Sequence, residues 1–217
     1  MRPSRHEMPA HAFADKRGYR EAILRAAAQE FALRGFDGAT TVAIAERAGV
    51  TQPLIHHHYG SKAKLWSSVL ADLFGALTSA IAEANKPVLG EKLRDRIQRL
   101  LRTTILFGAE RPELSRLIRL ESASGGSSFE QLYTVYLAPL IRFFEATFTA
   151  AEGAGLIRPL DRGFVYFAVM GAGMQLFTEP VTARRAFGID TRAPDVAHAY
   201  ADFVIDVMLG SVWEKGR

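Results

Sequence analysis

The side chains that could do chemistry are concentrated in one stretch of the chain, residues 40–62. Hydrogen-bond donors and acceptors gather on a short segment that has threonine before it and lysine after it. Such groups read base edges in the major groove of DNA, and an apolar side chain can meet a thymine methyl group. We therefore expect a base-reading face made of Thr51, Gln52, Leu54, His56 and His57.

Two short helices must position this face. The sequence predicts one over 41–48, with Thr40 as N-cap, and one over 52–58, with Pro53 in its first turn, where proline is tolerated. The tight turn between them needs a left-handed residue, which Gly49 can supply. This is the helix-turn-helix layout, in which the second helix enters the major groove. Apolar contacts for such a unit are available from Ile44, Ala45, Ala48, Val50, Ile55 and Tyr59.

Thr40 and Lys62 are candidates for binding phosphate. A capping hydroxyl and a lysine, each at the start of a helix, suit contacts to the DNA backbone, although Lys62 could also be a solvated side chain.

The run His56–His58 could be interpreted as a metal site. Successive helical residues point about 100° apart, so three in a row cannot chelate one ion, and we expect no metal. A packed, hydrogen-bonded His58 is the preferred alternative.

Helical periodicity continues along almost the whole chain, so the predicted fold class is all-α. We expect a flexible basic arm at 1–18, a helix-turn-helix domain at 19–66, and a helical ligand-binding and dimerisation domain at 67–217. The arm could enter a minor groove or be a disordered tail; its basic residues are Arg2, Arg5, Lys16 and Arg17. The predicted helices are 19–34, 41–48, 52–58, 62–85, 91–109, 112–122, 128–152, 162–179 and 195–209.

Charge and composition narrow the classes of protein. Residues 1–64 hold ten Lys/Arg and six Asp/Glu, whereas 65–217 hold 17 of each, so the whole positive excess lies in the first third. A basic segment beside a neutral one suits a nucleic-acid reader. The chain has no cysteine, which excludes disulfides, zinc fingers and thiol catalysis. No apolar run reaches about 18 residues and no secretory signal is evident, so we expect no membrane span and a cytoplasmic protein.

The pattern over 19–66 resembles the DNA-binding domain of the tetracycline-repressor (TetR-type) family. The resemblance rests on Ile23, Ala27, Phe31, Gly35 and Phe36, on Thr40, Thr41, Ile44, Ala45, Ala48, Gly49 and Val50, and on Ile55, His56, His57, His58, Tyr59, Ser61, Lys62 and Leu65. It implies that Thr40 and Lys62 contact phosphates and that Thr51, Gln52, Leu54 and His57 face bases. His56 stands where the family usually has tyrosine, and Ala63 where it commonly has glutamate. These departures bear on the operator sequence, not on the DNA-binding role.

Aromatic residues recur in the larger part of the chain, and a helical domain so rich in them can line a cavity for an apolar ligand. Most of these residues could equally be core. The candidates for the ligand pocket are Phe107, Glu121, Tyr133, Tyr136, Phe144, Met170, Met174 and Phe177. Small residues in one helix and an apolar stripe in the last helix suggest a two-fold dimer interface, the alternative being a hairpin buried in one subunit. Its candidates are Gly171, Tyr200, Phe203 and Val207.

These observations predict a ligand-responsive transcriptional regulator. We expect a homodimer that binds a palindromic DNA operator, with repression preferred to activation, and that a small apolar or aromatic effector releases. The alternative is a helical small-molecule carrier or scaffold without DNA binding. We find no Gly-rich phosphate loop, nucleophile elbow or His-Glu-x-x-His motif, so we expect neither an enzyme nor a cofactor.

Overall fold

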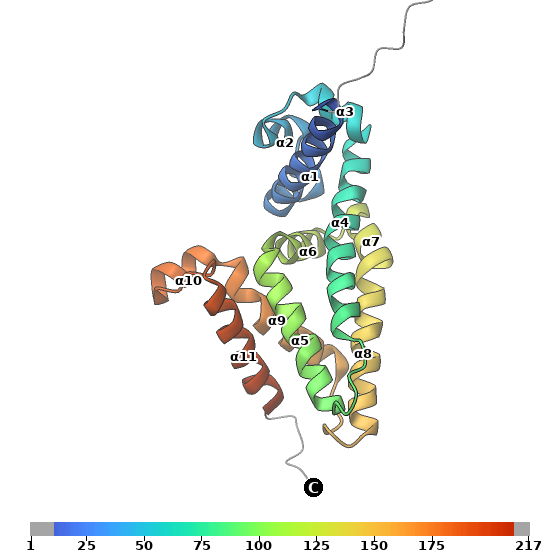
Figure 1. Ribbon diagram of the computed structural model, residues 1–217, viewed down its shortest axis with the longest axis vertical. Coiled ribbons are helices and arrows are strands. Elements are labelled where there is room, and N and C mark those ends of the chain that lie inside the picture. Colours follow the sequence, from blue (N-terminus) through green and yellow to red (C-terminus); the bar gives the residue numbers. More distant parts are fainter. Residues whose placement is uncertain (1–10, 211–217) are drawn as a thin grey trace, which may run out of the picture. The chain divides into compact units, whose positions relative to one another are not determined.

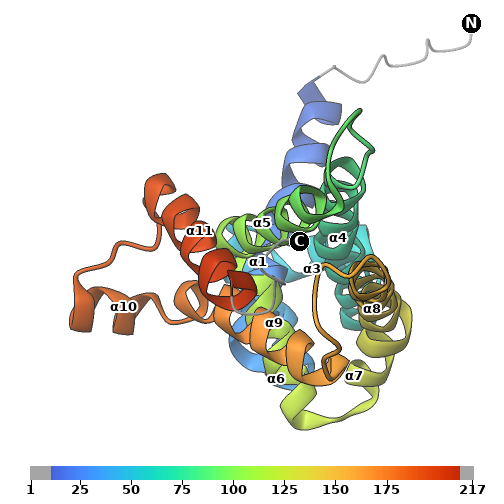
Figure 2. The same cartoon turned by 90° about the horizontal axis from the view of Figure 1, so that it is seen from below.

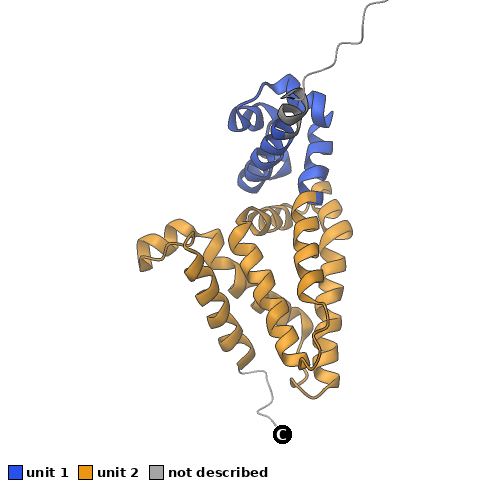
Figure 3. Ribbon diagram, viewed as in Figure 1, with its two compact units in different colours: residues 1–71 blue, residues 72–217 orange. Residues whose placement is uncertain are grey.

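The computed structural model describes residues 11–210, and within them the regular secondary structure is helical (Figure 1). The predicted all-α class is confirmed. The chain divides into two compact units at Ala71 and Asp72, inside the long helix α4, Lys62–Ala84 (Figure 3). The division falls a few residues after the expected boundary at 66.

The first unit contains α1, His11–Gly38, α2, Thr41–Ala48, α3, Gln52–Tyr59, and the start of α4. Regular α1 geometry is interrupted at Gly35, whose φ of 70° is favourable only for glycine. Aromatic rings form the centre of the core, with Phe31 edge-on to Trp66 at 5.0 Å and Phe36 at 5.5 Å from Trp66. These contacts anchor α4 on α1 within this unit.

The expected arm is only partly an arm. Helix α1 begins at His11, eight residues before the predicted start at Tyr19, so 11–18 are helical. Gly18 lies inside this helix, where one glycine costs only about 1 kcal/mol relative to alanine, and the rest of a long helix outweighs that. Arg2 and Arg5 lie outside the described residues.

The second unit contains the remainder of α4 and the following helices: α5, Leu93–Glu110, α6, Pro112–Ser124, α7, Ser127–Leu132, the π-helical turn η1, Tyr133–Leu137, α8, Ala138–Gly153, α9, Arg162–Thr178, α10, Pro180–Phe187, and α11, Pro194–Gly210. The helix predicted over 128–152 is one helical run that contains a π turn. Helix α10, which lies to one side of this unit away from α8, was not predicted (Figure 2). Pro180 begins this helix, because proline is well suited to the first helical turn, and Gly188 ends it in a left-handed conformation.

Helices α5, α9 and α11 pack on one another around the main core of this unit. Two glycines allow their close approach. A Cβ atom at Gly173 would lie 3.0 Å from Ile105 Cγ1, and one at Gly108 would clash with Met174 Sδ. Core positions from four helices and from the connection between α8 and α9 are filled by Ile97, Leu101, Phe148, Ala151, Ile157, Val169, Ile205 and Leu209.

Helix α4 is long and apolar enough to cross a membrane by length and composition alone, although no such span was expected from the sequence. Its apolar residues nevertheless form a buried stripe, with Leu65, Leu70 and Leu73 fully covered by protein. Lys64 and Asp72 interrupt its surface. A buried apolar stripe of this kind is typical of a core helix, and core helices of globular proteins can be as long and apolar as α4.

Candidate nucleic-acid interface and apolar cavity

The turn between α2 and α3 is built as the sequence predicted. Thr40 has extended backbone angles, and its Oγ1 accepts a hydrogen bond from Ala43 N at 3.1 Å. Gly49 adopts φ 67° and ψ 32°, and the N–H groups of Gly49 and Val50 donate to carbonyls of α2 at 3.2 and 3.0 Å. This pair of bonds is a Schellman motif, which closes the first helix and directs the chain into the second.

Helix α3 buries one side and exposes the other. Ile55 is fully buried, and the Tyr59 hydroxyl donates to the carbonyl of Arg20 at 2.8 Å, which fixes the helix on α1. The opposite side exposes four of the five predicted base-reading residues, Thr51, Gln52, His56 and His57, while Leu54 is half-buried. The short helix therefore presents a polar surface on a rigid base.

Two exposed side chains of α3 are held in place. The Gln52 amide nitrogen donates to Thr41 Oγ1 at 2.8 Å, which ties the first turn of α3 to α2. His56 Nδ1 lies 3.1 Å from the carbonyl oxygen of Gly60. Thr51 stands at the N-cap of α3 but makes no side-chain cap bond, and a backbone bond from Leu54 N to Thr51 O starts the helix.

Lys62 is not a freely solvated lysine. Its ammonium group donates to the carbonyl of Asp37 at 3.2 Å and lies 4.7 Å from the centre of the Phe36 ring. Ser61 caps α4 by accepting from Lys64 N at 3.2 Å. The ammonium group is therefore held beside Asp37, three residues before Thr40. A cationic group thus lies next to the segment that leads into the capped start of α2.

The three consecutive histidines differ in exposure. His56 and His57 are exposed, whereas His58 is half-buried with its ring 5.3 Å from that of His57. Among the residues that the structure describes, no group of three or more His, Cys, Asp or Glu side chains could hold a metal ion.

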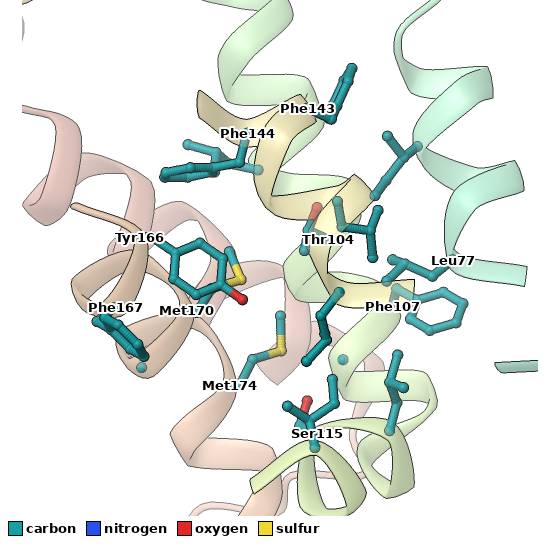
Figure 4. Close-up of a pocket in the computed structure, with 18 of the residues that line it drawn as sticks. Leu77, Thr104, Phe107, Ser115, Phe143, Phe144, Tyr166, Phe167, Met170 and Met174 are labelled. Atoms are coloured by element: carbon teal, nitrogen blue, oxygen red, sulfur yellow. The ribbon is translucent and has the colours of Figure 1, made fainter. Parts of the chain in front are cut away.

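The second unit encloses a cavity of about 430 Å³ between α4, α5, α6, α8 and α9 (Figure 4). This volume is within the range of small-molecule sites. Four of the predicted pocket residues line it, namely Phe107, Phe144, Met170 and Met174. Most of the lining is hydrocarbon from leucine, isoleucine and phenylalanine side chains.

The other four predicted pocket residues lie elsewhere. Glu121 is buried and accepts a hydrogen bond from the Ser128 hydroxyl, because α6 and α7 pack there. Phe177 is core, edge-on to Tyr200. Tyr136 stacks on Phe74 at 4.8 Å, with its own ring outside the lining, and Tyr133 is 43% exposed.

The main lining residue that sequence reasoning missed is Tyr166. A stripe of α9 at four-residue spacing, Tyr166, Met170, Met174 and Thr178, faces the cavity. This spacing was visible in the sequence, but nothing in it indicated which face of α9 would meet α5 and α8. Burial raises the pKa of the Tyr166 hydroxyl, and the neighbouring Tyr133 raises it further.

The predicted dimer residues have different surroundings. Phe203 and Val207, one turn apart on α11, are 60% and 54% exposed. The Tyr200 hydroxyl donates to the carbonyl of Ala172 within the same chain. Gly171 is exposed and lines the cavity, and a Cβ atom added there would meet nothing within 4 Å.

Two helices joined by a Schellman turn, the second with an exposed polar face, have the geometry of a helix-turn-helix unit of DNA-binding proteins. Comparison with protein families agrees. Residues 23–69 match the bacterial regulatory proteins of the tetR family, and 88–216 match the tetracyclin repressor-like C-terminal domain. The chain belongs to the tetR family and is a DNA-binding transcriptional regulator, not an enzyme.

Individual relatives are distant. The chain is 31% identical over 105 residues to the nucleoid occlusion factor SlmA of Vibrio atlanticus, a match that covers 48% of this chain and 52% of that protein. It is 28% identical over 153 residues to the regulator RutR of Escherichia coli, covering 69% of each. A crystal structure of AibR in complex with isovaleryl coenzyme A and operator DNA shares the fold, with a TM-score of 0.68, 20% identity, and coverage of 88% of this chain and 97% of that one.

Proposed function

We propose that this protein is a homodimeric repressor that binds a palindromic operator and is released by a small, mainly apolar effector. The observation that carries the proposal is the exposed polar face of α3, fixed by Tyr59 on one side and by the Gln52–Thr41 bond on the other. A rigid two-turn helix with its donors outward suits reading of base edges in the major groove.

Backbone contacts are assigned to Thr40 and Lys62. The lysine ammonium is held by Asp37 O and the Phe36 ring, close to the start of α2, where backbone N–H groups favour an anion. Base contacts are assigned to Thr51, Gln52 and His57, with Leu54 and His56 beside them. In this division, the phosphate contacts orient the protein on the DNA, and the α3 face selects the base sequence.

Dimerisation is assigned to the outer faces of α9 and α11. Phe203 and Val207 on α11 and Phe164 and Phe167 on α9 are all more than half exposed. A cluster of large apolar side chains on the surface of a globular domain marks an interaction site. A two-fold axis through these faces would pair two recognition helices with the two halves of a palindrome.

The effector is assigned to the cavity of the second unit. Helix α4 begins at Lys62 and reaches the cavity wall with Phe74, Leu77 and Ile81. A ligand that displaces this wall would move α4 and change the spacing of the two recognition helices, which must be about 34–36 Å for adjacent half-sites. AibR, which shares the fold, was crystallised with isovaleryl coenzyme A and operator DNA, so that protein binds both a small molecule and DNA.

The test is selection of bound sequences from a random pool of duplex DNA, followed by gel-shift titration. We expect an inverted repeat and a complex with two chains per duplex. Absence of any selected sequence would instead favour the carrier or scaffold without DNA binding. As a regulator of transcription, the protein would act in the bacterial cytoplasm.

A further inference from the structure

Four polar side chains of the lining already donate hydrogen bonds within the chain, whereas Arg119 and Ser122, which also line the cavity, are exposed. The hydroxyls of Thr104, Thr147 and Thr178 each donate to a carbonyl of their own helix, at 2.8–3.0 Å. The Gln175 amide donates to Glu179. These side chains leave little hydrogen-bonding capacity for a ligand.

Tyr166 differs from them. Its hydroxyl makes no hydrogen bond within residues 11–210, and Figure 4 shows it directed into the cavity, toward Met170 and Met174. The ring is held edge-on by Phe144 at 5.4 Å and by Phe167 at 5.3 Å. A fixed, half-buried phenol among apolar groups loses hydrogen bonding to water unless a ligand replaces it.

The protonation state favours donation. Burial raises the pKa of Tyr166 above its ordinary value, so the hydroxyl remains protonated at neutral pH. A neutral phenol can donate a hydrogen bond to an acceptor such as a carbonyl oxygen.

The shape of the cavity limits the rest of the ligand. Its wall follows α9 from Tyr166 to Thr178, which spans about 18 Å at a rise of 1.5 Å per residue. A volume of about 430 Å³ holds roughly 14 non-hydrogen atoms if each occupies the space of one water molecule, about 30 Å³.

We propose that Tyr166 determines effector specificity, and that the cavity takes an elongated, mainly hydrocarbon molecule with a carbonyl oxygen that accepts a hydrogen bond from the Tyr166 hydroxyl. This inference rests on the proposal that the cavity is the effector site. It adds the chemical class of the ligand and the residue that selects it.

The test uses two compounds of nearly equal shape that differ in the carbonyl group, benzophenone and diphenylmethane. Dissociation constants are measured by calorimetric titration of the full chain without DNA. Tyr166→Phe removes only the hydroxyl, and we expect it to shift the ratio of the two constants about two- to tenfold toward the hydrocarbon. The shift should be the same at pH 7 and pH 9, because the hydroxyl stays protonated.

Two control variants make the outcome specific. Ser115→Ala removes a second half-buried hydroxyl of the lining, which, like that of Tyr166, makes no hydrogen bond in the described part of the chain. Tyr136→Phe removes a phenol that lies outside the lining. Both should keep the wild-type ratio. The proposal is overturned if Tyr166→Phe leaves the ratio unchanged, if Ser115→Ala produces the shift, or if the wild type binds neither compound.

Failure of the repressor proposal would look different. Selection from the random pool, followed by gel shifts of ligand-free wild type and Tyr166→Phe, measures DNA binding by itself. If the wild type selects no sequence while the ratio shift is intact, the repressor proposal is rejected and the ligand assignment stands.

Discussion

Replacing Lys62 with alanine removes a cation whose position is fixed by two contacts. The ammonium group is held by Asp37 O at 3.2 Å and by the Phe36 ring at 4.7 Å. Neutralising one phosphate contributes about 0.9 to the slope of log K against log salt concentration. A dimer carries two copies of Lys62, so Lys62→Ala should reduce that slope by about 1.8.

The assay is fluorescence anisotropy with the selected operator and with an unrelated duplex, at several salt concentrations. Affinity for both duplexes should fall by the same factor, because phosphates carry no direct sequence information. Lys62→Arg should keep most of the slope, since it keeps the charge. Lys86→Ala serves as a charge-matched control, because Lys86 is exposed and paired with Glu83 in the second unit. An unchanged slope, or a change of preference at one base pair, would refute the phosphate assignment.

Three further predictions concern bases, assembly and pH. Gln52→Ala and His57→Ala should each relax selection at particular base pairs, by about 1–3 kcal/mol where the contact is bidentate, and unaltered selection profiles would remove them from the interface. Phe203→Asp should dissociate the dimer in sedimentation experiments, because it places charges in the interface. Gly171→Leu should also dissociate the dimer, because it overpacks the interface. A variant that stays dimeric and binds the operator normally would show that its residue does not lie in the interface. Hydrogen bonds from an arginine and a backbone N–H lower the pKa of Glu152. The contribution of Glu152 to stability is therefore present above about pH 4 and is lost as the pH falls through the lowered pKa. Urea unfolding between pH 6 and pH 3 would show this loss, and a free energy of unfolding that stays constant over this range would contradict the assignment.

The DNA-binding unit was predictable because its determinants are local. The Thr40 cap bond joins atoms three residues apart, and the left-handed Gly49 closes a turn within five residues. Such signals are complete within a short window of sequence. The contact of Tyr59 with Arg20 spans 39 residues, and only the apolar type of the side chain had indicated its burial.

The cavity was harder to predict because it depends on which faces of distant helices meet. Phe144 and Phe177 are both phenylalanines in apolar helices, yet one lines the cavity and the other packs in the core. Such pairings depend on close crossings between distant helices, for example at Gly108 and Gly173, where the absence of a side chain lets α5 and α9 approach. Sequence spacing gives the face of each helix but not its partner.

The π-helical turn η1 has a consequence for how this cavity could change in evolution. A π turn holds one residue more than the α-helical turn it replaces, so the extra residue is accommodated without turning the helices on either side. Deleting one residue from 133–137 would restore α geometry and leave α7 and α8 in nearly the same relative rotation. Leu137, the last residue of this turn, and Leu140, just after it, lie on the cavity wall. A single deletion here would therefore alter the wall only at the turn and keep the lining faces of the neighbouring helices in place.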